Sequence, residues 1–252
     1  MYPRSPLESI KKFHQELTLL RRDLHAHPEL GFQEMRTSGI VAGALEALGV
    51  EVHRGIGKTG VVGVIHGLSD ASQRMIGLRA DMDALPILEE SNVDHRSTKP
   101  GLMHACGHDG HTAILLGAAK HLAQTRNFDG TAVLIFQPAE EGLGGARAMI
   151  DDGLFDRFPC DAVYGLHNWP ALPAGVIGIN PGPMMAASDK FEIVIEGRGG
   201  HGAHPYQTID PIIIAAQIIT ALQTIVSRNV HPAESAVISV SPGILTLVKT
   251  CS

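Results

Sequence analysis

The chain has 252 residues, of which 44% are hydrophobic and 18% are charged. This balance is typical of a folded protein with a substantial core and excludes a disordered chain. The formal charge of -6 lacks the basic excess of a nucleic-acid-binding protein. Three cysteines are too few for a disulfide framework, and we find no signal peptide and no run of about 20 apolar residues. We therefore expect a soluble cytoplasmic protein with neither a nucleic-acid nor a membrane partner.

The chain begins with two expected helices. Ser5 and Pro6 make a good helix start, because a capping residue precedes a proline in the first turn. Apolar residues then recur with a helical period as far as Leu24. A second helix is expected over residues 37–48, and Gly49 ends it.

Short apolar runs follow, with helical segments among the later ones. The apolar runs cover residues 61–65, 75–78, 133–136 and 162–166, and the helical segments cover residues 114–123 and 146–150. The first two runs could pair as a hairpin. Because the later runs alternate with helices, we expect an α/β sheet with helices packed on it.

The pattern changes after the Pro181-Gly182-Pro183 break. Residues 191–196 largely alternate between apolar and polar side chains, as a strand with one solvated face does. A long apolar helix is expected over residues 211–226 and another short strand over residues 236–240. The series suggests a second, smaller α+β domain, so we place the domains at residues 1–185 and 186–252.

The segment 103–111 is the densest in groups that can bind a metal, with the sequence MHACGHDGH. Cys106 and His108 can converge from a loop, where Gly107 permits a tight bend before a helix that begins near Asp109. A thiolate and an imidazole together suit Zn²⁺ or a similar ion. Taken alone, the segment would fit a buried cysteine in a turn with solvent-facing histidines.

Acidic residues follow another expected strand, in the sequence QPAEEG at residues 137–142. Neighbouring acidic side chains point in different directions, so one can bind a metal ion while the other accepts a proton from water. A solvated acidic turn is the commoner fate of such a pair. Here Phe136 and Pro138 place the pair directly beyond a core strand, where α/β folds put their ligand sites.

Two further strands end in polar groups of the same kind. His167 follows the run that ends at Leu166, and Asp81 and Asp83 follow residues 76–80. The two aspartates could hydrogen-bond the metal-binding imidazoles and select their tautomers. Four segments of similar chemistry at strand ends together predict a metal site.

Five motifs give the chain its resemblance to a known family. They are RDLHAHPE at residues 22–29, RADMDALP at 79–86, MHACGHDGH at 103–111, QPAEEG at 137–142 and GGHGAHP at 199–205. Over about the first 240 residues, the chain resembles the hippurate hydrolase branch of the aminoacylase and carboxypeptidase G superfamily.

The resemblance implies a zinc-exopeptidase-like catalytic domain with a mixed sheet, interrupted by a smaller α+β lid domain through which homodimers form. It also implies two divalent ions, of Mn, Zn, Co or Ni. Four positions match the family's metal ligands: Cys106, His108, Glu141 and His167. Glu140 matches the general base, and His201 matches a lid histidine that reaches the partner's site and stabilises the oxyanion. Without the resemblance, His201 would be taken as a turn histidine in a glycine-rich loop.

The chain departs from the family pattern at its end. The family places a last metal-binding histidine beyond the lid, whereas this chain ends at Ser252 with a tail, residues 241–252, of unfamiliar sequence. We therefore expect a truncated chain that lacks part of the lid and of the catalytic sheet.

The preferred interpretation is an amidohydrolase that cleaves hippurate-like or N-acetyl amino acids to a carboxylic acid and an amino acid. One alternative is an inactive fragment that keeps only partial metal binding or association. A zinc-dependent deaminase is a further alternative, but its Pro-Cys-x-x-Cys motif does not occur in the chain.

Overall fold

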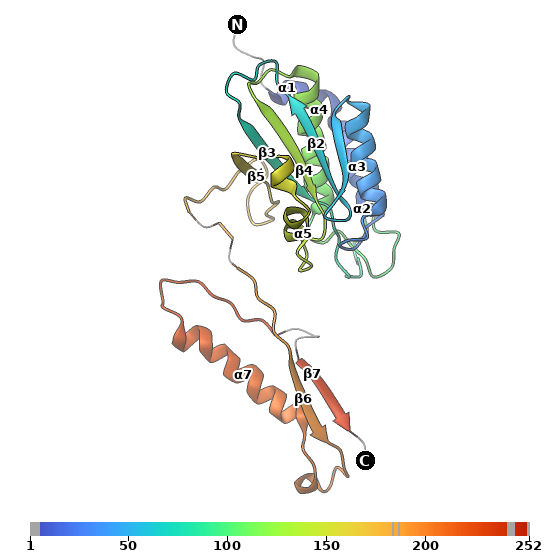
Figure 1. Cartoon of the computed structure of the whole chain (residues 1–252). Helices are drawn as coiled ribbons and strands as arrows, with labels where there is room; N and C mark the ends of the chain where they lie inside the picture. The colour runs from blue at the N-terminus through green and yellow to red at the C-terminus, as the bar shows by residue number, and fades with distance from the viewer. Residues whose placement is uncertain (1–5, 183, 186, 241–244, 251–252) are drawn as a thin grey trace. The chain divides into compact units, whose positions relative to one another are not determined.

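The computed structural model describes residues 6–182, 184–185, 187–240 and 245–250. The chain forms two compact units, Met1–Gly175 and Val176–Ser252, each with its own sheet (Figure 1). This division falls before the boundary expected after residue 185.

The first unit contains a mixed five-stranded sheet. Its strands are β1 (Glu51–Ile56), β2 (Gly60–His66), β3 (Met75–Asp81), β4 (Thr131–Gln137) and β5 (Ala162–Gly165), in the order β1-β2-β4-β3-β5. Strand β2 is antiparallel to β1 and β4, whereas β3 is parallel to β4 and β5. The expected α/β fold with a mixed sheet is confirmed.

The expected hairpin between residues 61–65 and 75–78 is wrong, because β4 lies between β2 and β3. All seven residues of β4 are buried, so this strand takes the centre of the sheet. Strand β1 covers the free edge of β2 instead. The apolar pattern did not reveal β1, because most of its residues are exposed or half-buried.

Helices cover both faces of this sheet (Figure 1). The chain begins with α1 (Pro6–Ile10), a 3₁₀ turn (Lys11–Phe13) and α2 (His14–Ala26), where a single helix was expected, and α3 (Met35–Ala47) and α4 (His108–Thr125) follow. Leu134 and Phe136 of β4 lie in one core cluster with residues of α3 and α4. Val133 and Ile135 point to the opposite face, where they share a cluster with residues of α5 (Gly145–Asp151) and α6 (Leu154–Arg157).

The second unit pairs β6 (Ile193–Arg198) in parallel with β7 (Leu245–Thr250) and adds a 3₁₀ turn (Pro205–Gln207) and α7 (Pro211–Asn229). Asp210 caps α7, because its Oδ1 accepts the Ile212 N–H at 2.9 Å, and Pro211 occupies the first turn. The strand expected over residues 236–240 is wrong, since these residues form no regular element. Among the described residues β6 pairs with β7 instead.

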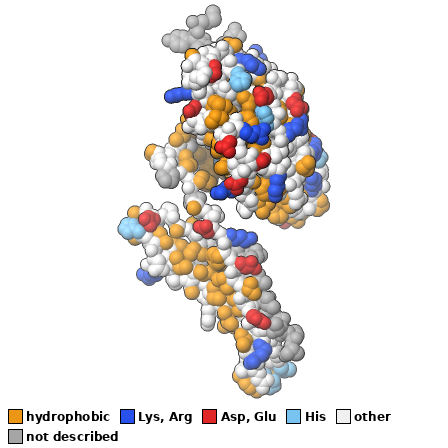
Figure 2. Space-filling view, in the orientation of Figure 1, with side chains coloured by type: hydrophobic (Ala, Val, Ile, Leu, Met, Phe, Trp, Pro, Cys, Tyr) orange, Lys and Arg blue, Asp and Glu red, His pale blue; other side chains and the backbone are white. Residues whose placement is uncertain are grey.

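Helix α7 exposes a broad apolar surface in the second unit (Figure 2). Ile212 and Ile213 are more than half exposed. By length and composition alone this helix could cross a membrane, a test that core helices of soluble proteins also pass. The absence of a membrane partner stays a prediction.

Candidate metal centre

The turn that begins α4 places His108 at the carboxyl ends of the parallel strands. Gly107 caps the helix with a φ of +89°, a backbone conformation that residues other than glycine rarely adopt. A Cβ atom on Gly107 would also lie 2.7 Å from the Asn168 side chain. This position therefore needs glycine both for its backbone conformation and for its packing.

The first turn of α4 is also fixed to α2. The Oδ2 atom of Asp109 lies 2.8 Å from Nδ1 of His25 and 2.7 Å from Nε of Arg21. The hydrogen bond with Asp109 raises the pKa of His25, which favours a charged imidazolium in this buried pair. Through His25, the RDLHAHPE segment thus fixes the position of Asp109 in the segment that carries Cys106 and His108.

The imidazole of His108 is completely buried among carboxylates. Its Nε2 lies 3.6 Å from Oδ2 of Asp81, 3.8 Å from Oε1 of Glu141 and 3.9 Å from Oε2 of Glu140. Within the described residues, Nε2 of His108 has no hydrogen-bond partner. A buried polar atom without a partner is costly, so this position calls for a further atom that binds nitrogen and carboxylate oxygen.

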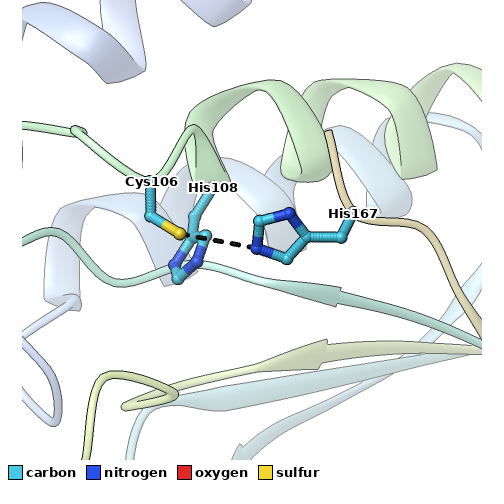
Figure 3. A group of neighbouring side chains, drawn as sticks. All are labelled: Cys106, His108 and His167. Carbon is cyan, nitrogen blue, oxygen red and sulfur yellow. Dashed lines mark hydrogen bonds between the residues drawn. The ribbon is translucent and has the colours of Figure 1, made fainter. Parts of the chain in front are cut away.

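Cys106 and His167 meet beside His108 (Figure 3). The Cys106 Sγ lies 3.4 Å from Nε2 of His167, and the three residues offer ligand atoms within 4.8 Å of one another. The backbone oxygen of Asn168 accepts the Nδ1 hydrogen of His167 at 2.7 Å. Because Nδ1 carries the hydrogen, the lone pair of Nε2 faces the cysteine and can bind a metal ion.

His111 supports the site. Its Nδ1 donates to Oδ1 of Asp81 at 2.6 Å, and its Nε2 accepts the backbone N–H of Asn168 at 2.9 Å. Since both nitrogens have partners, His111 holds Asp81 and the residue beside His167 in place. Sequence reasoning missed this role, although His108 and His111 are three apart on a helix and therefore share a face.

The two glutamates approach the same imidazole from the turn after β4. Glu140, Glu141 and His108 offer ligand atoms within 4.8 Å of one another. The Glu141 side chain is 25% exposed and the Glu140 side chain 40% exposed. The backbone N–H of Glu141 donates to Oδ2 of Asp83 at 2.9 Å, which fixes the turn against β3.

The structure therefore brings together the proposed ligands around His108, in two overlapping groups. Cys106 and His167 belong to one group, and Glu141 belongs to the other. Their roles as ligands stay predictions, as does the role of Glu140. The expected aspartates contact imidazoles, Asp81 that of His111 and Asp83 that of His108.

The electrostatics of this cluster fit a divalent cation. Burial, followed by the charges of Glu141 and Glu140, raises the pKa of Cys106 to about 12. Burial alone would raise the pKa of Asp81, but the His111 hydrogen bond and nearby positive charges outweigh it and hold that pKa at about 2. A divalent cation would offset the excess negative charge and deprotonate the thiol. The thiol, imidazole and carboxylate donors therefore fit a divalent metal.

His201 lies in the second unit, in the loop between β6 and α7. Its Nδ1 accepts the backbone N–H of Ala203 at 3.1 Å, and the side chain is exposed. The residue lines a cavity of about 370 Å³ together with Arg198, Thr208 and Asp210. Its expected role at a partner's site stays a prediction.

Comparisons with known proteins agree with this geometry. The model of peptidase family M20/M25/M40 matches residues 77–248. The chain is 53% identical over 225 residues to hippurate hydrolase from Campylobacter jejuni, covering 89% of this chain and 58% of that protein. It is 51% identical over 224 residues to N-acyl-L-amino acid amidohydrolase from Geobacillus stearothermophilus, covering 88% and 59%.

A solved structure shows the same fold. A dinuclear metal-binding peptidase of the M20 family from Bacillus subtilis is 40% identical, with a TM-score of 0.65, and the match covers 85% of this chain and 57% of that one. The chain thus spans somewhat over half the length of these relatives. With the family model matching most of the chain, the resemblance to the hippurate hydrolase branch is confirmed, and the chain belongs to peptidase family M20/M25/M40.

Proposed function

We propose that this chain provides the metal centre of a cytoplasmic amidohydrolase that cleaves N-acyl amino acids to a carboxylic acid and an amino acid. The observation that carries the proposal is the buried His108 Nε2, which has no hydrogen-bond partner among the described residues and faces three carboxylates beside a cysteine and a second histidine. The similarity to hippurate hydrolase and to N-acyl-L-amino acid amidohydrolase supports the substrate class.

In this proposal two divalent ions bind at the cluster, and their identity lies among Mn, Zn, Co and Ni. The ligands from this chain are Cys106, His108, Glu141 and His167. When bound, the ions supply Lewis acidity, which polarises the amide carbonyl and makes water acidic enough to react near neutral pH. Glu141 suits a ligand's role because its Oε1 is buried without a hydrogen-bond partner among the described residues.

Glu140 is the proposed general base. Its carboxylate is the more exposed of the pair, so water and substrate can reach it. It takes a proton from the water whose oxygen bonds to the carbonyl carbon. It then gives a proton to the amine nitrogen as the carbon–nitrogen bond breaks. The products are a carboxylic acid and a free amino acid, and Glu140 regains its charge.

His201 completes the proposal through a homodimer. Its exposed position in a glycine-rich loop leaves Nε2 free to donate to an oxyanion in a second subunit's site. One such donor contributes on the order of 3 kcal/mol to transition-state stabilisation.

Hydrolysis assays test the proposed function. The assay compares the 252-residue chain with a chimera in which a C-terminal part of the Campylobacter jejuni hippurate hydrolase follows residues 1–240. Hippurate and N-acetylcysteine serve as substrates, with Mn²⁺, Zn²⁺ or Co²⁺ added. We expect the chimera to release the amino acid, and a chelator to abolish the reaction. A folded, metal-loaded chimera that hydrolyses neither substrate would contradict the proposal.

A further inference from the structure

Glu34 is a buried acidic residue that contacts the turn carrying the two glutamates. Its side chain is completely buried just before α3. The Oε1 atom accepts the backbone N–H of Ala139 at 2.8 Å, and Oε2 accepts the Thr59 hydroxyl at 2.6 Å. Burying a carboxyl group costs free energy unless hydrogen bonds satisfy it, and these two bonds offset that cost for Glu34. They join three segments that are far apart in the sequence.

Ala139 has an unusual backbone conformation. Its φ is +50°, in the left-handed region that costs a non-glycine residue about 1–2 kcal/mol. Ala139 is completely buried, and a Cβ atom on Gly31 would lie only 3.0 Å from its Cα and Cβ atoms. The backbone oxygen of Ala139 also accepts the Gly145 N–H at 2.9 Å. Both backbone polar groups of Ala139 are therefore hydrogen-bonded, its N–H to Glu34 and its oxygen to Gly145.

The left-handed residue determines how the chain leaves β4. Ala139 immediately precedes Glu140 and Glu141, so its φ sets the direction in which both glutamates project. Both carboxylates reach within 4 Å of the His108 Nε2. If Ala139 relaxed to a negative φ, the following residues would turn away from this imidazole.

We infer that Glu34 is a positioning residue for the metal centre, which holds Ala139 in its left-handed conformation and thereby directs Glu140 and Glu141 toward His108. The inference rests on the proposed function. Glu34 acts on the amino-terminal side of the glutamate pair, whereas Asp83 holds the Glu141 N–H from β3. The role is separate from ligation, because Glu34 belongs to none of the groups of possible metal ligands among the described residues.

Titration of the 252-residue chain with Co²⁺ tests this role. Binding is followed by the charge-transfer band that a cysteine thiolate gives with Co²⁺, and circular dichroism reports folding. We expect Glu34→Ala to weaken Co²⁺ binding about tenfold or more, as loss of a residue that orients ligands does. Glu34→Gln should bind within about threefold of the unsubstituted chain, because its side-chain oxygen can still accept the Ala139 N–H.

Thr59→Val is the matched control, because it removes the Thr59 hydrogen bond to the same carboxylate and leaves the Ala139 hydrogen bond in place. It should lower stability while Co²⁺ affinity stays within about threefold. If Glu34→Ala does not fold, Glu34→Asp takes its place, since its shorter carboxylate cannot reach Ala139 in the same way. The expected loss is then also about tenfold.

The outcomes separate the inference from the proposed function. A folded Glu34→Ala or Glu34→Asp variant with unchanged Co²⁺ affinity and spectrum would overturn the role of Glu34 alone. Loss of affinity in Thr59→Val equal to that in Glu34→Ala would overturn it too, since the effect would then be one of general stability. Absence of thiolate-ligated Co²⁺ in the unsubstituted chain would overturn the proposed metal centre and, with it, the role of Glu34.

Discussion

The Oδ1 atom of Asp83 lies 3.3 Å from Nδ1 of His108, and Oδ2 of the same carboxylate accepts the backbone N–H of Glu141 at 2.9 Å. One buried side chain therefore contacts both the imidazole of His108 and the backbone of Glu141 in the proposed metal centre. A carboxylate beside Nδ1 favours the tautomer that keeps the lone pair on Nε2, where the acidic cluster lies.

Asp83→Asn should weaken metal binding about 10- to 100-fold, the usual cost of losing a partner that orients a ligand. An amide nitrogen facing His108 would favour the opposite tautomer, in which Nε2 carries the hydrogen. Isothermal titration with Zn²⁺ measures the change. Asp151→Asn is the control, because Asp151 is exposed and, within the described part of the chain, its side chain pairs only with Arg147. Equal affinities in the two variants would contradict this prediction.

The two glutamates should differ when each is replaced by glutamine. Glu140→Gln keeps the shape of the side chain but cannot accept a proton from water, so turnover by the chimera should fall by 10²–10⁴-fold while metal content is unchanged. Glu141→Gln should lose metal as well as activity. Metal analysis beside hippurate hydrolysis measures both effects. Substantial activity in Glu140→Gln would show that the assigned roles are wrong.

The cysteines allow a paired test of the thiolate ligand. Cys106→Ser should abolish the thiolate charge-transfer band with Co²⁺ and weaken binding, because a hydroxyl is a much poorer ligand than a thiolate for this ion. Cys160→Ser should keep the band, since Cys160 is absent from every metal-binding group among the described residues. A band that survives in Cys106→Ser would exclude Cys106 as a ligand.

His104 should make stability depend on pH. It is 3% exposed, and burial, as the largest cause, lowers its pKa to about 4. The unfolded state, with an ordinary pKa of 6.5, therefore takes up a proton first as the pH falls. Stability from neutral His104 is present above pH 6.5 and is lost as the pH falls towards 4. Between pH 7 and pH 5 the loss should be about 2 kcal/mol.

The free energy of unfolding by urea, measured across this pH range for His104→Phe and for the unsubstituted chain, isolates this effect. A chelator in both samples removes any bound metal. Phenylalanine fills a similar volume and does not titrate, so its variant should lack about 2 kcal/mol of the fall between pH 7 and pH 5. Parallel pH profiles for the two proteins would show that His104 does not titrate as its burial indicates.

Sequence patterns predicted most of the regular elements in the first unit. Apolar patterning revealed the helix α4 and the wholly buried strand β4, which reads as a continuous apolar run. It missed β1, whose residues are mostly exposed or half-buried. It also suggested a hairpin between β2 and β3, because periodicity says which residues are apolar but not which strand lies beside which. The strand expected over residues 236–240 failed for a similar reason, since a strand needs a partner as well as a pattern.

The sequence by itself determined the chemistry of the candidate site, because the donor residues lie in short motifs next to glycines and strand ends. Cys106 and His108 could be selected in this way without any knowledge of their neighbours in space, whereas the division of roles between Glu140 and Glu141 came from the family resemblance. Only the tertiary structure decided which groups support them. The contact between Glu34 and Ala139 spans 105 positions in the sequence, and it depends on packing that no local pattern records. Burial and hydrogen bonding are properties of the folded neighbourhood, so such a role becomes visible only after the segments have come together.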